Sequence, residues 1–235
     1  MINIEYRVEK KYLVSDFDLT VLAQRLSAVA KPDVHQTGTC YEIRSIYFDD
    51  IQDSCLNENE SGIDCRKKYR IRTYGTADSP IKLEIKEKYR SMTKKRSCTL
   101  STSEYHAITD RSMPLQFGDR IPLNQLTLQM RCAGMKPKVI ITYERTAFVH
   151  PVGNVRITFD RNIAASREYS DLLNPNVSAL IPILPAGMHI LEVKYDEFLP
   201  DIIAKQLEIG NLSQTSFSKY YLGRLAVNGI FPIQK

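Results

Sequence analysis

Several short segments of this 235-residue chain alternate charged with aliphatic residues at a period of two. In the segment 81–88, Lys82, Glu84, Lys86 and Lys88 alternate with aliphatic side chains. Successive side chains of a β-strand point to opposite faces, so such a segment predicts a strand with one apolar and one charged face. The pattern therefore favours an antiparallel sheet over a helical fold.

The same alternation recurs along the chain, and its polar members are mostly Arg and Lys. It is found at Arg7, Glu9 and Lys11; Arg70 and Arg72; Lys94 and Arg96; Tyr143 and Arg145; Arg156; and Glu192 and Lys194. A single strand of this kind can simply expose its charged face to water. On neighbouring strands, however, like charges repel unless an anion lies between them. We expect seven strands to form an antiparallel β-barrel whose wet interior holds a polyanion.

The remaining segments predict helices around this barrel. They are Asp16–Ala30 after a Ser15 cap, a short helix after the Ser101 capping box, Leu123–Cys132, and a C-terminal helical pair at Asp201–Ile209 and Phe217–Val227. No linker, repeat or low-complexity tract divides the chain. The expected fold is therefore α+β, with a single domain covering residues 1–235.

Composition limits the setting of the protein. The formal net charge is only +5, so the basic residues matter only if they are concentrated. The five cysteines include no CxxC pair, which favours reduced thiols and a cytoplasmic protein. The chain has no signal-peptide core and no apolar run of about 20 residues. We expect no direct membrane insertion, and contact with a membrane only through a partner protein.

The residue types on the charged faces suit phosphate. Arginine binds two phosphate oxygens at once, and lysine adds a mobile charge. Carboxylates in such a site repel phosphate unless a hard cation such as Mn²⁺ or Mg²⁺ bridges them. Glu192 is the main metal candidate, followed by Glu9 and Glu84. Ordinary ion pairs with Lys11 and Lys86 are an equal alternative for these last two.

Other catalytic arrangements find little support in the sequence. The four histidines are scattered, and no Ser/His/Asp or Cys/His arrangement is recognisable. Neither a P-loop nor a G-x-G-x-x-G loop occurs. Stacking aromatics do not interleave with the cations, so we expect no nucleic-acid partner.

Eight motifs in order resemble the polyphosphate polymerase domain of the vacuolar transporter chaperone (VTC) family, within the CYTH-like triphosphate tunnel metalloenzymes. They cover nearly the whole chain: Arg7-x-Glu9-x-Lys11-Tyr12, residues 70–75 (RIRTYG), 83–86 (LEIK), 94–96 (KKR), 143–148 (YERTAF), 155–160 (VRITFD), 191–194 (LEVK) and 216–220 (SFSKY).

The resemblance implies specific roles for these residues. Phosphate contacts that also carry catalysis are expected from Lys11, Arg70, Arg72, Lys86, Arg145 and Arg156, with Glu192 on the metal. Further phosphate contacts are expected from Arg7, Lys94, Arg96, Tyr143, Lys194, Ser218 and Lys219. Two departures stand out: Arg7 replaces the first Glu of the superfamily's Glu-x-Glu-x-Lys motif, and Ser216 replaces a Lys of the polymerase.

The leading hypothesis is metal-dependent phosphoryl transfer from a nucleoside triphosphate, ATP, to a growing polyphosphate chain, with pyrophosphate among the related ligands. One rival is a triphosphatase or nucleotide phosphohydrolase, which differs in whether water is positioned for attack. Another is a non-catalytic module that binds polyphosphate.

Overall fold

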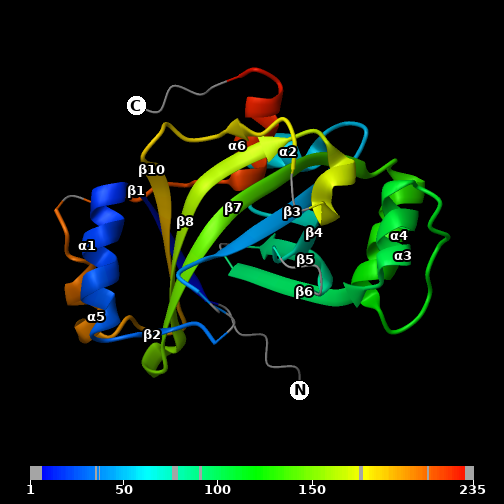
Figure 1. Ribbon diagram of the computed structural model, residues 1–235. Helices are drawn as coiled ribbons and strands as arrows, with labels where there is room; N and C mark the ends of the chain where they lie inside the picture. The colour runs from blue at the N-terminus through cyan, green and yellow to red at the C-terminus, as the bar shows by residue number, and fades with distance from the viewer. Residues whose placement is uncertain are drawn as a thin grey trace. The chain divides into compact units, whose positions relative to one another are not determined.

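The structure is a computed structural model that describes residues 7–34, 36, 38–75, 79–89, 92–174, 177–210 and 212–230. Its ten strands form an antiparallel sheet, which confirms the expected α+β class (Figure 1). The strands are β1 (Val8–Ser15), β2 (Lys31–Pro32), β3 (Tyr41–Asp49), β4 (Arg66–Thr73), β5 (Ile81–Tyr89), β6 (Met92–Leu100), β7 (Lys136–His150), β8 (Val155–Ser166), β9 (Ile181–Pro182) and β10 (Met188–Tyr195).

Five of the six helices in the described residues follow the sequence expectation; α2 was not predicted. They are α1 (Asp16–Ser27), α2 (Ser54–Glu60), α3 (Thr102–Thr109), α4 (Ile121–Cys132), α5 (Asp201–Leu207) and α6 (Lys219–Val227), with short 3-10 turns at Val152–Asn154 and Tyr169–Leu173. Ser15 and Ser101 each cap the following helix in a capping box. In the part of the chain that the structure describes, no helix is long and apolar enough to cross a membrane.

The chain divides into two compact units, and β7 and β8 each contribute to both. Unit 1 takes its described residues from Met1–Glu42, Tyr143–Ile163 and Leu184–Ser218. Unit 2 takes them from Ile43–Thr142, Ala164–Ile183 and Lys219–Lys235. The expectation of one single domain over residues 1–235 stays a prediction.

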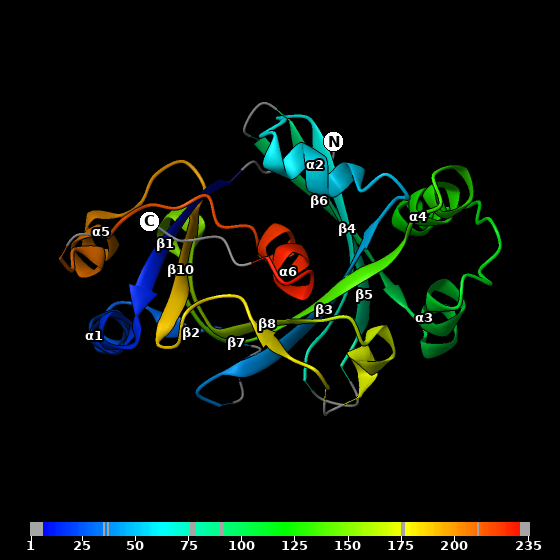
Figure 2. The ribbon, with the colours of Figure 1, turned by 90° about the horizontal axis from the view of Figure 1, so that it is seen from above.

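In unit 1 the strand order is β1-β10-β8-β7, and β2 pairs with β7. One face of this sheet is apolar and packs against α1 through Leu19, Leu22 and Leu26, all fully buried. Helix α5 lies beside α1 (Figures 1 and 2). The segment around Gln214 pairs with β1 at Tyr12, so it covers part of that strand's outer edge. The opposite face of the sheet carries the charged residues.

In unit 2 the order is β7-β3-β4-β5-β6, and β9 pairs with β8. Its apolar face contributes Ile71, Leu83 and Ile85 to a core that also takes in residues of α3 and α4. Helix α6 packs so closely on β7 that a Cβ at Gly223 would collide with Ile141. Each unit thus buries an aliphatic face against helices, as the alternating pattern predicted.

Besides the two-residue strands β2 and β9 and the 3-10 turns, two elements were not predicted from the sequence. Strand β3 is buried almost throughout, so it lacks the polar alternation that marks the other strands. Helix α2 is short and polar, and its first turn is fixed by a side chain that lies before the helix in the sequence. The backbone N–H groups of Cys55 and Leu56 donate to the buried Asp49 carboxylate at 2.9 and 3.1 Å. Neither feature leaves a local periodic signal.

Candidate functional site

The charged face of unit 1 is organised in rows across three strands. Lys11 of β1 stands opposite Glu192 of β10, which in turn faces Thr158 of β8. In the next row, Glu9, Lys194 and Arg156 align in the same way. The register therefore places these predicted site residues side by side on one face of the unit 1 sheet, as their spacing indicated.

The two glutamates of these rows are linked through one lysine. Lys194 Nζ lies 2.7 Å from Glu192 Oε1 and 3.4 Å from Glu9 Oε2. Lys11 Nζ lies 3.1 Å from the other Glu9 oxygen and donates to the Phe217 carbonyl at 2.9 Å. Lys11 therefore lies between the Glu9 carboxylate and the backbone just before Ser218. The Glu192 side chain is only 7% exposed, so its charge depends on these cations.

Arg145 is fixed by a carboxylate that was seen in the sequence only as part of a motif. Its Nε and Nη2 bind the two oxygens of Asp160 at 2.7 and 2.8 Å, and Nη2 lies 3.6 Å from Glu192. Burial alone would lower the pKa of Arg145, but Asp160, Tyr143 and Glu192 outweigh it and raise the pKa well above its usual value. Asp160 follows Arg156 and Thr158 at the same period-2 spacing, which is the signal that could have identified it.

Arg156 and Arg7 have partners of their own in unit 1. Arg156 Nη1 lies 2.9 Å from the buried Asp33, and its Nη2 donates to the Tyr41 hydroxyl at 3.2 Å. Arg7 Nε lies 2.9 Å from Asp196. Arg7 also donates to the Asn154 carbonyl, so it ties the start of β1 to the turn before β8. These contacts support a structural task for Arg7 beside the predicted phosphate contact.

In unit 2 the charged face has a different balance. Glu84 of β5 stands between Arg70 of β4 and Ser97 of β6. The row beside it contains three lysines directly opposite one another: Lys68, Lys86 and Lys95. The row on the other side of Glu84 aligns Arg72, Lys82 and Thr99. Like charges placed directly opposite each other destabilise a sheet, so this arrangement calls for an anion.

Glu84 is the buried anchor of that face. Arg70 binds one of its oxygens through Nε and Nη2, both at 2.6 Å, while Arg72 Nε lies at 3.8 Å and Lys95 Nζ at 3.4 Å. Burial alone would raise the pKa of Glu84, but Arg70, Arg72 and Lys95 outweigh it and hold the pKa far below its usual value. Glu84 therefore stays ionised and fixes the arginines. This geometry favours the ion-pair alternative for Glu84 over the metal role.

Strand register bears on the predicted phosphate contacts of β6. Lys94 stands opposite Glu87, and Arg96 stands opposite Ile85. Both therefore belong to the face of β6 that Cys98 shares, the face toward the apolar core, and not to the face of Glu84. Lys95, which the sequence analysis passed over, lies on the charged face. The phosphate-binding role of Lys94 and Arg96 stays a prediction that this register disfavours.

Arg70 is also supported from β3 and α6. Its Nη1 donates to the Tyr47 hydroxyl at 3.1 Å, and the Tyr47 ring lies 5.4 Å from the Tyr220 ring. Tyr220 donates to Asp49 and accepts from Arg224 Nη1 at 2.9 Å. Burial alone would raise the pKa of Tyr47, but Arg70 and Arg72 outweigh it and lower the pKa. Burial and Asp49 raise the pKa of Tyr220, which stays a hydrogen-bond donor.

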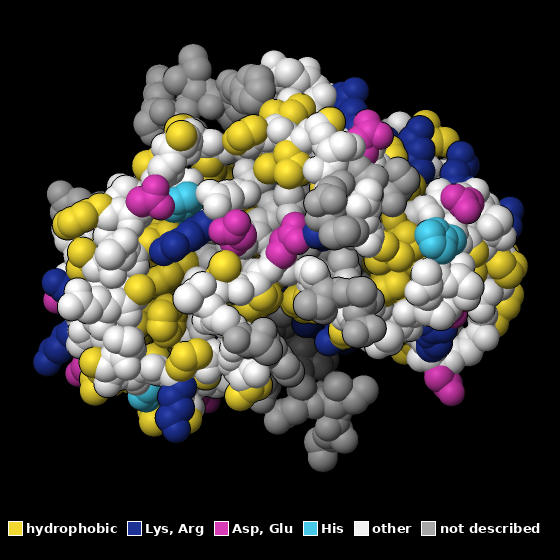
Figure 3. All heavy atoms as spheres, viewed as in Figure 1, with side chains coloured by type: hydrophobic (Ala, Val, Ile, Leu, Met, Phe, Trp, Pro, Cys, Tyr) yellow, Lys and Arg dark blue, Asp and Glu magenta, His cyan; other side chains and the backbone are white. Residues whose placement is uncertain are grey.

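Both charged faces contain buried polar atoms without a hydrogen-bond partner among the described residues. In unit 2 these are Arg72 Nε and Ser45 Oγ, whose residues are register partners on β4 and β3. In unit 1 the Thr158 hydroxyl, beside Glu192, also lacks a hydrogen-bond partner among the described residues. A buried polar group without a partner costs about 1–3 kcal/mol. On the side of the molecule drawn in Figure 3, Lys and Arg are dispersed among Asp, Glu and hydrophobic side chains.

The comparisons with known proteins identify first the fold and then the family. A protein from Hippeastrum is described as a candidate adenylyl cyclase with a dominant triphosphatase activity. It is 12% identical to this chain, with a TM-score of 0.57 over 97% of this chain and 98% of that one. A candidate adenylate cyclase from Bacillus halodurans is 14% identical, with a TM-score of 0.52 over 87% of each chain. At these identities the likeness defines the fold, which is that of the triphosphate tunnel proteins.

The family model described as the VTC domain matches residues 6–228. The chain therefore belongs to the VTC domain family, which confirms the resemblance seen in the eight motifs. A sequence comparison with curated proteins gave no match.

Proposed function

We propose that this protein transfers phosphoryl groups from a nucleoside triphosphate, ATP, to a polyphosphate chain. The observation that carries the proposal is the charge pattern of the two sheet faces. Unit 2 offers an excess of cations around one anchored carboxylate, and unit 1 offers carboxylates interleaved with cations. An excess of Arg and Lys suits phosphate oxygens, and interleaved carboxylates suit a metal–phosphate complex.

The cations of unit 2 would bind phosphate groups. Arg70 is fixed by Glu84 and Tyr47, so its guanidinium is preorganised and loses little freedom when an anion binds. The buried Nε of Arg72 lies 3.8 Å from Glu84 but has no hydrogen-bond partner among the described residues, which suits a phosphate oxygen as acceptor. Lys86 and Lys95 would add charge from the neighbouring row.

The carboxylates of unit 1 fit a divalent cation under one condition. Among the described residues, no group of three or more His, Cys, Asp or Glu is placed to hold a metal ion. Glu192 and Glu9, which share Lys194, can provide only part of a coordination sphere. Mg²⁺ is commonly bound by one or two carboxylates with substrate phosphates and water as the other ligands. The donor set thus fits Mn²⁺ or Mg²⁺ together with bound phosphate.

In this proposal the charged side chains do the catalytic work. Bound metal would supply charge neutralisation on the phosphate oxygens. Arg145, held rigid by Asp160, and Lys11 would stabilise charge that develops on the transferred group. Arg156, Lys194 and Tyr143 would orient the chain, and Ser218 and Lys219 would contact phosphate beside the start of α6. Phosphoryl transfer needs positioning and electrostatic stabilisation but no covalent nucleophile of the enzyme.

Hydrolysis of triphosphate is the second candidate. It is favoured by the likeness to the Hippeastrum protein, which has a dominant triphosphatase activity and shares this fold. The same cations and carboxylates would serve, with water in place of the growing chain as the acceptor.

For either reaction we propose a cytoplasmic enzyme without a nucleic-acid partner, which contacts a membrane only through another protein. All five cysteines are free, consistent with that compartment.

Product analysis separates these functions. Purified protein is incubated with ATP and Mn²⁺ or Mg²⁺, and the products are resolved as polyphosphate, free phosphate or unchanged ATP. Long phosphate chains are the expected product. Free phosphate alone would replace the polymerase with the hydrolase, and tight binding of tripolyphosphate without turnover would leave a binding module. Turnover that persists with the metal chelated would contradict the metal-dependent mechanism.

A further inference from the structure

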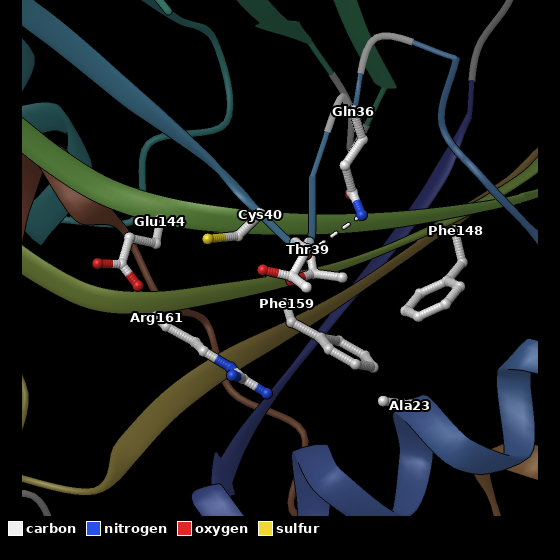
Figure 4. A pocket seen from close by; sticks show the side chains of 9 residues that line it. Ala23, Gln36, Thr39, Cys40, Glu144, Phe148, Phe159 and Arg161 are labelled. Carbon is white, nitrogen blue, oxygen red and sulfur yellow. Dashed lines mark hydrogen bonds between the residues drawn. The ribbon is translucent and has the colours of Figure 1, made fainter. Parts of the chain in front are cut away.

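Unit 1 contains a second candidate site on the face of β7 and β8 that points away from Arg145 and Asp160. There, a cavity of about 300 Å³ lies among α1, the loop before β3, and these two strands (Figure 4). Glu144 and Arg161 line it, and each is the chain neighbour of a residue in the Arg145–Asp160 pair. Because neighbours along a strand point to opposite faces, this cavity is separate from the charged face of the sheet.

The floor of the cavity is apolar. Phe148 is 7% exposed there, and its ring packs on the fully buried Phe159 ring, with centroids 5.4 Å apart at an interplanar angle of 56°. Ala23 of α1 lines the cavity with only a methyl group, which leaves the space beside the rings open (Figure 4). An apolar, concave surface with a few polar groups is the usual form of a small-molecule site.

One wall of the cavity is held in place by hydrogen bonds. The Gln36 amide donates to the Thr39 carbonyl at 3.2 Å and accepts from the Ala147 backbone N–H at 2.8 Å. The Thr146 hydroxyl donates to the same Thr39 carbonyl at 2.9 Å. The loop is therefore tied to β7 at several points, so the cavity does not depend on a ligand for its shape.

Arg161 gives the cavity its chemical preference. Within the described part of the chain, its buried Nε has no hydrogen-bond partner, and no carboxylate forms an ion pair with it. Arg145 and Arg156 in the same unit each have an aspartate partner. The Glu144 carboxylate accepts from Asn162 at 3.1 Å, and Figure 4 draws it on the side away from the Arg161 guanidinium. A guanidinium beside an apolar floor suits an anion attached to an apolar body.

We propose that this cavity binds a small anionic molecule with an apolar body, with its acidic group on Arg161 and its apolar part against Ala23 and the accessible part of Phe148. The site is independent of the phosphate chemistry proposed above, since it uses none of the same side chains. A ligand bound there would lie behind the strands that carry Arg145 and Asp160.

The test uses the fluorescent probe 8-anilinonaphthalene-1-sulfonate with the full chain. Fluorescence titration should give saturable binding of one probe per chain. Arg161→Gln should weaken it by about tenfold through loss of a charge-assisted contact. Ala23→Leu should weaken it by a similar factor, because the larger side chain fills the cavity without adding a polar group. Arg25→Gln, on the exposed side of α1, is the charge-matched control and should leave the affinity within about twofold.

Circular dichroism and thermal unfolding establish that each variant is folded before it is titrated. The neutral analogue N-phenyl-1-naphthylamine tests the role of the acidic group and should bind about tenfold more weakly than the sulfonate. Equal affinity of the probe for all four proteins would overturn the proposal, as would a lack of saturable binding to the wild type. Equal binding of the neutral analogue would overturn the assignment of Arg161 as the anion contact.

Discussion

The charged sheet faces of the two units differ in their balance of cations and carboxylates. In unit 1 each cation has a carboxylate neighbour: Lys11 with Glu9, Lys194 with Glu192, Arg145 with Asp160, and Arg156 with Asp33. In unit 2 a single buried carboxylate, Glu84, serves Arg70, Arg72 and Lys95, while Lys68 and Lys86 add further positive charge. The balanced face suits a metal bound with phosphate, and the cation-rich face suits phosphate itself.

The comparison predicts that removing the main carboxylate of unit 1 has the largest effect on activity. Glu192→Gln should lower turnover with ATP and Mn²⁺ by roughly a hundredfold or more, because charge stabilisation in the transition state is lost. Binding of tripolyphosphate without metal should stay largely intact. The exposed Glu197→Gln is the matched control. Full activity of Glu192→Gln would remove this residue from the metal role.

In unit 2 the corresponding change should affect stability first. Glu84→Gln leaves Arg70 and Arg72 buried without their carboxylate, which should cost about 3–5 kcal/mol in the free energy of unfolding. Tripolyphosphate should restore more stability to this variant than to the wild type, because the anion replaces the lost charge. Urea unfolding with and without tripolyphosphate measures both. A variant that is as stable as the wild type without ligand would contradict the anchor role.

Glu84 also determines whether the free energy of unfolding rises or falls with pH. Folding lowers the pKa of Glu84 from its ordinary value of 4.5, so its contribution to stability is full above about pH 4.5. This contribution is lost progressively as the pH falls below that value toward the folded-state pKa. The wild type should therefore lose stability more steeply than Glu84→Gln in acid. Parallel curves of unfolding free energy against pH for the two proteins would show that Glu84 is not the cause of the acid-induced loss of stability.

A smaller loss of stability is expected when the contact of Tyr220, which packs against the Arg70 partner Tyr47, is removed. Tyr220→Phe removes the hydrogen bond to the buried Asp49 but keeps the ring stacked on Tyr47. We expect a loss of about 1.5–3 kcal/mol, the usual range for a hydrogen bond to a charged group. Tyr221→Phe is the control, because this half-buried neighbour on the same helix loses only a longer hydrogen bond, 3.3 Å, to Glu60 at the surface. Equal unfolding free energies for the two variants would argue against the Asp49–Tyr220 contact.

The smallest effect tests the strand register. Lys95→Gln should weaken tripolyphosphate binding a few-fold, because an exposed lysine contributes modestly at the edge of the cation-rich face. Lys94→Gln changes the same charge on the opposite face of β6 and should have less effect. Calorimetric titration at low salt compares the two. A stronger effect from Lys94→Gln would reverse the face assignment.

The strands with alternating charge could be predicted because one face of each is apolar and the other polar, a signal carried within the strand itself. Strand β3 could not, since it is buried on both faces. The sequence run Lys94-Lys95-Arg96 fits either face, and only the pairing of Tyr89 with Met92 at the hairpin decides between them. Likewise, Tyr220 acts through contacts with Asp49 and Tyr47, which are distant in the sequence, so its role leaves no local signal. That strands of both units line one cavity stays a prediction.

The most direct test is a crystal structure of the protein with Mn²⁺ and a non-hydrolysable ATP analogue. The account predicts Mn²⁺ bound to the Glu192 carboxylate and to phosphate oxygens, with Lys194 displaced from its 2.7 Å contact, and phosphate groups within hydrogen-bonding distance of Arg70 and Arg72. An intact Glu192–Lys194 pair, with the triphosphate bound away from these arginines, would contradict it.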